Sequence, residues 1–272
     1  MPQRTDIFKH TLLIILCIFS VFPVLWMLVS SFKPLSEIFN SSLIIKNPTF
    51  DNYVRALESL PILKMIINTF IIAFSEAVLQ LFTAILASYA LTRWHFKGSG
   101  IIMAILSLTW LIPIQAIMIP NYVTISSMGL RNTILGVILP NIVSVFAILS
   151  IYTSFKSFPR VLVEAAVMDG LSEKSILFRI ILPNIKASLI SIGILLFISG
   201  WNEYIWAMMV NSNLDQAPIQ IGLQSFMNIE TYDDNSWGIL MAASTLSCLP
   251  ILAIYLVMQK QIINSFVKGG IK

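Results

Sequence analysis

Long apolar runs without a charged residue constrain this chain more than any other feature. The first, residues 11–32, follows Arg4, Lys9 and His10 and contains no Asp, Glu, Lys or Arg. A helix of this length crosses the ~30 Å hydrocarbon core of a bilayer. A secretory signal peptide has a shorter apolar region and a small-residue cleavage site, so we expect this run to be retained as a transmembrane helix.

The composition agrees with a membrane location. Hydrophobic residues make up 57% of the chain and charged residues only 11%, and the mean hydropathy is +0.85. Soluble domains have about 45–50% apolar and about 25% charged residues. The net charge of +4 is too small and too scattered to form a nucleic-acid surface. We therefore expect an integral membrane protein with no nucleic-acid partner.

Five further apolar runs predict a total of six transmembrane helices in an all-α, polytopic fold. The expected spans after the first are 65–91, 101–120 with a bend at Pro113, 133–152, 187–210 and 238–259. Residues 33–64 read as an aqueous loop with one short helix, and 211–237 as a second polar outer loop. The predicted organisation is an N-terminal part (1–64), a membrane core (65–260) with a polar loop (155–186), and a basic tail (261–272).

Lysine and arginine positions predict the orientation in the membrane. Six spans put both termini on one side, and with the termini inside, 12 of the 17 basic residues fall in inner segments. The final outer loop has no basic residue and carries four acids: Asp215, Glu230, Asp233 and Asp234. This is the positive-inside pattern, so we expect both termini, and the loop at 155–186, to be cytoplasmic.

A polar segment at residues 164–183 interrupts the apolar pattern on the inner side. Its residues predict two helices with a bend. Ala165 and Ala166 are expected on one side of the first helix, where another surface could approach, and Gly170 can take the left-handed conformation that ends a helix. Ser172 is the expected N-cap of the second helix, with an apolar stripe at 176, 177, 180 and 181.

This segment resembles the cytoplasmic signature loop of ABC-importer permeases. The family pattern is EAA, three residues, G, nine residues and I-x-L-P, and it matches here at Glu164, Ala165, Ala166, Gly170, Ile180, Leu182 and Pro183. The resemblance implies a type I ABC-importer permease fold that docks two ATPase subunits through this loop. The implied coupling residues are Glu164, Ala165, Ala166, Met168, Asp169, Gly170, Leu182 and Pro183. The alternative is a helical hairpin that only connects two spans.

The chain contains no pattern for chemistry of its own. It has no GxxxxGK[ST] loop, so ATP is expected to be bound by partner subunits and no cofactor by this chain. No spacing of His, Cys or carboxylates suggests a metal site, and nothing pairs a nucleophile with a histidine. Cys17 and Cys248 lie inside apolar runs, where small core residues are the ordinary explanation. We expect a transport subunit without catalytic residues.

Further segments narrow the resemblance to carbohydrate-importer permeases of the maltose and oligosaccharide type. The principal element is Gly200-Trp201-Asn202-Glu203-Tyr204-Ile205-Trp206-Ala207, and weaker ones include Phe50-Asp51-Asn52-Tyr53 and Gly129-Leu130-Arg131-Asn132. This resemblance implies a bacterial cell-membrane subunit with a second permease, expected to be a different chain, and an extracytoplasmic sugar-binding protein. The rivals are an importer of a polyamine, peptide or anion, and a secondary carrier or channel without an ATPase.

Four residues of the fifth span are candidates for the translocation path: Trp201, Asn202, Glu203 and Tyr204. A carboxylate within a span usually faces the bundle interior or a wet cavity. With its aromatic and amide neighbours, Glu203 would suit the apolar face and hydroxyls of a sugar. The alternative is a structural network that fixes a bend of this span. Glu76 and Gln80, one turn apart in the second span, present the same choice, and there we favour packing.

Overall fold

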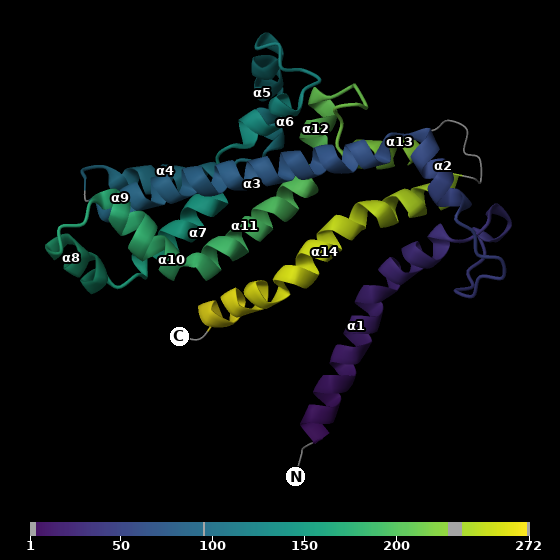
Figure 1. The fold of residues 1–272 in the computed structure, drawn as a ribbon, viewed down its shortest axis with the longest axis horizontal. Coiled ribbons are helices and arrows are strands. Elements are labelled where there is room, and N and C mark those ends of the chain that lie inside the picture. Colours follow the sequence, from purple (N-terminus) through teal and green to yellow (C-terminus); the bar gives the residue numbers. More distant parts are fainter. Residues whose placement is uncertain (1–3, 95, 228–235, 271–272) are drawn as a thin grey trace. The chain divides into compact units, whose positions relative to one another are not determined.

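The computed structural model describes residues 4–94, 96–227 and 236–270, and all regular structure in these ranges is helical (Figure 1). The predicted all-α class is confirmed. Two compact units divide the chain: Met1–Ile66 with Ile219–Leu252, and Ile67–Pro218 with Ala253–Lys272. Three of the acids expected in the last outer loop, Glu230, Asp233 and Asp234, lie outside the described residues, as does Lys272 of the predicted tail.

The first unit contains the first predicted span and the larger part of the last one. Its elements are α1 (Arg4–Ser31), the 3-10 helix η1 (Leu35–Glu37), α2 (Asp51–Ser59), the start of α3 (Ile62–Arg93), α13 (Ile219–Met227) and the first part of α14 (Ser236–Gly270). Residues Lys9–Ser31 of α1 and Trp237–Lys260 of α14 are long and apolar enough to cross a membrane. Both predicted spans are confirmed. The backbone of α14 continues as a helix into the expected tail and ends at Gly270.

Asn52 holds the chain where α1 ends. Its amide nitrogen donates to the carbonyl oxygens of Ser31, at 3.0 Å, and Lys33, at 2.8 Å. Ser31 is the last residue of α1 and Lys33 follows the helix, so neither carbonyl has a partner within it. Three aromatic rings from the same segments pack together beside it: Phe32, Phe50 and Tyr53. The FDNY element (50–53) thus has a structural role: it holds the end of α1 against α2, and we call this contact the lock between the two helices.

The second unit holds the remaining helices around α3. They are α4 (Ser99–Thr109), α5 (Gln115–Ser127), α6 (Ile134–Ile138), the 3-10 helix η2 (Leu139–Asn141), α7 (Val145–Lys156), α8 (Arg160–Met168), α9 (Glu173–Ser175), the π-helix η3 (Ile176–Ile181), α10 (Leu182–Asn184), α11 (Lys186–Trp201) and α12 (Ile205–Val210). Helix α7 packs against α4 and α11, and α12 packs against α5 and α6 (Figure 1). The hairpin of α8 and α9 lies at the end of α3 that Arg93 terminates (Figure 1).

The spans between the first and the last are less continuous than the apolar runs predict. The second span is one helix, Ile62–Arg93, whereas the fourth is a pair of helices bent by 46°. The third differs from the expected single helix bent at Pro113, because α4 already ends at Thr109 and α5 begins at Gln115. A proline lacks the backbone N–H that a helix interior needs, and it disfavours helical geometry in the residue before it.

The fifth predicted span is interrupted as well. Helix α11 ends at Trp201 and α12 starts at Ile205, so residues 202–204 form a break in the expected helix over 187–210. At its other end, α11 meets the preceding segment Glu173–Asn184 at 79°. In the described part of the chain, three helices are long and apolar enough to span a membrane, or five spans if each bent pair counts as one.

Candidate functional site

Helix α8 ends as its sequence predicts. Gly170 has a φ of +74°, in the left-handed region that residues with a side chain seldom adopt. The amide of Gly170 donates to the Val167 carbonyl at 3.0 Å, and that of Leu171 to the Ala166 carbonyl at 3.1 Å. These bonds satisfy carbonyls that the helix end leaves open. The predicted bend at Gly170 is confirmed.

The second half of the hairpin begins at the predicted cap. The Ser172 hydroxyl accepts the Ser175 amide at 3.4 Å. Instead of one α-helix, the chain then forms α9, the π-helix η3 and α10. Ile176, Leu177 and Ile181 are buried, and Lys174 and Arg179 are exposed, so the expected apolar stripe is present. π-helical turns are rare and occur often at functional sites.

The coupling residues on α8 divide between an inner and an outer face. Ala166 is buried at 2% exposure, whereas Ala165 is exposed, so the expectation that both lie on one side is wrong. Neighbouring residues of a helix point about 100° apart, and only one of them can face the η3 segment that α8 packs against. Met168, 87% exposed, is an apolar side chain without cover, and Asp169 and Gly170 are exposed beside it.

The end of the hairpin faces solvent in part. Leu182 is half-buried and Pro183 is exposed. Pro183 lies in α10, which continues the π-helix η3 without a break. The outward side of the hairpin therefore presents Ala165, Met168, Asp169, Gly170 and Pro183, a surface that a partner could cover.

A clamp that the sequence did not suggest ties the hairpin to α3. The Glu173 carboxylate accepts two hydrogen bonds from the Arg93 guanidinium, at 2.9 Å and 3.1 Å, and one from the Tyr89 hydroxyl at 2.5 Å. A bidentate pair of this kind fixes geometry as well as charge. The partners are 80 and 84 residues apart, and no spacing in the chain joins them. Their only signal was a pair of opposite charges on segments predicted to lie on one side of the membrane.

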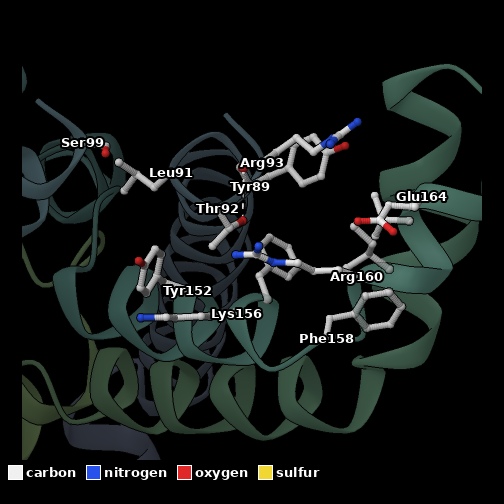
Figure 2. Close-up of a pocket in the computed structure, with 13 residues that line it drawn as sticks. Tyr89, Leu91, Thr92, Arg93, Ser99, Tyr152, Lys156, Phe158, Arg160 and Glu164 are labelled. Atoms are coloured by element: carbon white, nitrogen blue, oxygen red, sulfur yellow. Dashed lines mark hydrogen bonds between the residues drawn. The ribbon is translucent and has the colours of Figure 1, made fainter. Parts of the chain in front are cut away.

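A cavity of about 450 Å³ lies beside α8, between α3 and α7 (Figure 2). Glu164 lies on its α8 side, together with Arg160, which extends across the cavity toward Thr92 (Figure 2). The other lining residues are Tyr89, Leu91, Arg93, Ser99, Tyr152, Phe155, Lys156, Phe158, Val163 and Ile181. Glu164 is exposed as well as lining this pocket, and at a spacing of four residues it lies on the same side of α8 as Met168.

The four candidates for the translocation path lie at the break between α11 and α12. Trp201 is buried at 2% exposure and its ring packs 5.8 Å from that of Phe197. Glu203 accepts the Trp206 amide at 3.0 Å, which caps the start of α12. Asn202 is exposed and Tyr204 half-buried. A role for these residues in the path stays a prediction, but the contacts of Trp201 and Glu203 favour the structural alternative.

Glu76 connects three segments deep in the second unit. Glu76 is only 3% exposed, and its carboxylate accepts a hydrogen bond from the side-chain amide of Asn141 at 3.0 Å. The side-chain amide of Gln80 donates to the backbone carbonyl of Asn141 at 2.5 Å. A Cβ on Gly200 would lie 2.9 Å from the Glu76 carboxylate and 3.1 Å from Cα of Ala73, so the glycine permits a close approach of α11 to α3. The first residue of the GWNEY element thus serves close packing, and so do Glu76 and Gln80.

Helices long and apolar enough to cross a membrane, a short polar hairpin and a broken apolar helix are the features expected of a membrane transport subunit. Residues 80–267 match the binding-protein-dependent transport system inner membrane component family. The chain belongs to this family and is a multi-pass permease subunit of a binding-protein-dependent importer.

Curated relatives align over nearly the whole chain. The arabinooligosaccharides transport system permease protein AraQ of Bacillus subtilis is 31% identical over 93% of this chain and 90% of its own length. The diacetylchitobiose uptake system permease protein NgcG of Streptomyces coelicolor is 28% identical over 98% and 89%. The lactose transport system permease protein LacG of Rhizobium radiobacter is 27% identical over 98% and 96%.

A solved structure shares the fold. A chain of a bacterial ABC transporter involved in the import of the acidic polysaccharide alginate superposes with a TM-score of 0.84. The two chains are 23% identical, and the match covers 96% of this chain and 98% of that one. The predicted type I permease fold is confirmed.

Proposed function

We propose that this chain is one of two permease subunits of an ATP-driven importer for a saccharide. The relatives named above take up diacetylchitobiose, arabinooligosaccharides or lactose according to their names, and they align with at least 93% of this chain. The GWNEY element (200–204) and the FDNY element (50–53) resemble elements of carbohydrate permeases. Residues 65–260 would form the permease core, with half of the translocation path.

The outward surface of the α8 hairpin carries the proposal that ATPase subunits drive transport. Val161, Leu162, Val167 and Met168 leave apolar surface exposed along α8, and an exposed apolar patch marks a site that a partner covers. The hairpin itself is rigid, because the glycine bend, the Ser172 cap and the Arg93–Glu173 clamp each fix one part of it. A rigid element of this kind can transmit the movement of a docked ATPase to α3.

The remaining partners follow from the proposed orientation. With both termini in the cytoplasm, the α8 hairpin meets two ATPase subunits, which bind the ATP. A second permease, expected to be a different chain, completes the path, and a sugar-binding protein delivers the cargo to the outer loops. The exposed apolar faces of the spans would contact lipid and the second permease.

Uptake measurements on the reconstituted importer test this function. Vesicles would be given labelled mono- and oligosaccharides, and vanadate and a protonophore would be compared as inhibitors. We expect uptake of a saccharide that vanadate stops and the protonophore does not. Inhibition by the protonophore alone would identify a secondary carrier and overturn the proposal.

Two variants test the hairpin directly. Met168→Asp and Glu164→Lys are expected to insert into the membrane normally but to lose uptake and the ATP hydrolysis that the binding protein stimulates. Glu58→Lys, the same charge change on the exposed face of α2, is the control and is expected to retain both. Full activity of the hairpin variants would remove the assignment of the hairpin as the ATPase contact.

A further inference from the structure

We propose that the cavity beside α8 binds the phosphate headgroup of an anionic phospholipid. The sequence did not suggest this site, and it does not depend on which solute the importer carries. The cavity lies within the second unit, between the ends of α3 and α7 and the inner side of α8 (Figure 2). Its volume of about 450 Å³ is within the usual range for a small-ligand site, about 300–1,000 Å³.

The charges in the cavity favour an anion. Three of its lining side chains are cationic (Arg93, Lys156 and Arg160) and one, Glu164, is acidic. Arg93 is engaged by Glu173, which leaves Lys156 and Arg160. Neither forms an ion pair with any residue in the described ranges, and Arg160 does not pair with Glu164 although the two are one turn apart on α8.

The positions of these two cations suit a shared ligand. Arg160 reaches across the opening toward Thr92, and Lys156 lies beside Tyr152, its ammonium group 5.9 Å from the ring centroid (Figure 2). A phosphate between them could accept from the Arg160 guanidinium and the Lys156 ammonium, whereas the Thr92 hydroxyl already donates to the Ser88 carbonyl. Arginine forks and lysine charges are the groups that proteins use to bind phosphate.

The surroundings favour a lipid over a soluble phosphate. The apolar span Ile62–Arg93 ends at the cavity, so the site lies where the hydrocarbon is expected to give way to headgroups. Trp94 and Phe96, 51% and 42% exposed, follow directly, and tryptophan is enriched at this depth. Part of the lining is apolar, including Leu91, Phe158 and Val163, which could cover the glycerol of a lipid. Basic pockets between helix ends are a known way to recognise anionic lipids.

Native mass spectrometry of the full chain, purified with the subunits that accompany it, tests the proposal. The protein would be titrated with phosphatidylglycerol or with phosphatidylcholine, and bound lipid counted. We expect one phosphatidylglycerol to be retained in preference to phosphatidylcholine. In the double variant Lys156→Gln/Arg160→Gln, the apparent affinity for phosphatidylglycerol is expected to fall roughly tenfold to thirtyfold, because two charges near the headgroup are lost.

A matched control removes the same charge outside the cavity. Lys174→Gln/Arg179→Gln changes two exposed cations of the same hairpin and is expected to leave lipid retention unchanged. Equal loss in both double variants would show general surface attraction and overturn the proposal. Release of the bound lipid by millimolar inorganic phosphate, with no preference for phosphatidylglycerol, would assign the cavity to soluble phosphate instead. If Lys156→Gln/Arg160→Gln retains the lipid but loses the accompanying subunits, the cavity binds a protein partner and the lipid proposal is wrong.

Discussion

Among single residues, Asn52 has a role that its surroundings define closely. It is buried and donates to two backbone carbonyls at the end of α1. Asn52→Ala leaves both acceptors without a partner, which costs about 1–3 kcal/mol in the free energy of unfolding. The neighbouring Asp51→Ala removes only an exposed pair with Arg55, worth about 0–1 kcal/mol.

Thermal unfolding of the two variants in detergent measures this difference. The midpoint for Asn52→Ala is expected well below that for Asp51→Ala, which is expected near the parent. Equal midpoints would mean that the two carbonyls find other donors and that Asn52 is not the lock between α1 and α2.

Gly200 is a residue at which a single methyl group is expected to matter. An added Cβ would lie 2.9 Å from the Glu76 carboxylate and 3.1 Å from Cα of Ala73, so the backbone of α3 or α11 has to shift. Overpacking of this kind costs about 1–3 kcal/mol. We expect Gly200→Ala to lower the unfolding midpoint by a corresponding amount.

Gly193, two turns earlier on the same helix, is the matched control. Its added Cβ would meet only the end of the Leu81 side chain, at 3.0 Å, and that group can rotate away. Gly193→Ala is therefore expected to be close to neutral. If the two alanine variants unfold at the same temperature, the close approach of Glu76 to Gly200 does not constrain the helix pair.

At the scale of elements, the Arg93–Glu173 clamp is the joint through which the hairpin holds α3. Both side chains are partly exposed, 29% for Arg93 and 42% for Glu173, so the pair is worth roughly 1 kcal/mol of stability and no more. Its effect on transport is expected to be larger, because a loose joint no longer passes the movement of the hairpin to α3.

A graded series at this joint separates the two effects. Arg93→Lys keeps the charge but loses the bidentate fork, and Arg93→Gln loses both. We expect uptake to fall in the order parent, Lys, Gln, while the unfolding midpoint changes little. Lys97→Gln, an exposed cation in the next loop, is the control. If uptake falls only in proportion to the unfolding midpoint, the Arg93–Glu173 pair has a structural role and does not transmit movement.

The elements also show what could be predicted from the sequence and what could not. The apolar runs located the membrane-crossing segments, and the EAA pattern placed the bend at Gly170, because both signals are local. The ends of α4 at Thr109 and α11 at Trp201 were missed. A hydrophobic run reports where the chain is apolar, not where its backbone bonds are continuous, and a break is tolerated when it is buried in protein or lines a cavity.

In the candidate site, only the contacts between residues close in the sequence could be predicted. Ser172 and Gly170 act on neighbouring residues, so their roles could be inferred from residue type and spacing. Glu173 with Arg93, and Glu76 with Asn141, are contacts across more than 60 positions, and no periodicity connects them. Which of Ala165 and Ala166 is buried likewise depends on where η3 lies, and no sequence pattern indicates that position.

At the scale of the whole molecule, the charge distribution makes a prediction about orientation. The predicted inner segments hold 12 of the 17 lysines and arginines, and the described part of the last outer loop, up to Met227, holds none. Because positive charge is retained in the cytoplasm during insertion, the α8 hairpin is expected inside and the loop after α12 outside. Helix α11 separates the two within one compact unit.

Single cysteines test this orientation in intact cells. In a background with Cys17→Ala and Cys248→Ala, we would introduce Met168→Cys on the hairpin and Leu214→Cys in the loop after α12; both side chains are exposed. A thiol reagent that does not cross membranes is expected to label position 214 in intact cells, and position 168 only in inside-out vesicles stripped of the ATPase subunits that are proposed to cover it. Labelling of both from one side would mean that α11 does not cross, and the opposite pattern would place the hairpin out of reach of any ATPase. Either result would remove the physical basis for driving transport from the cytoplasm, since the energy of ATP could then not act on α3 through this joint.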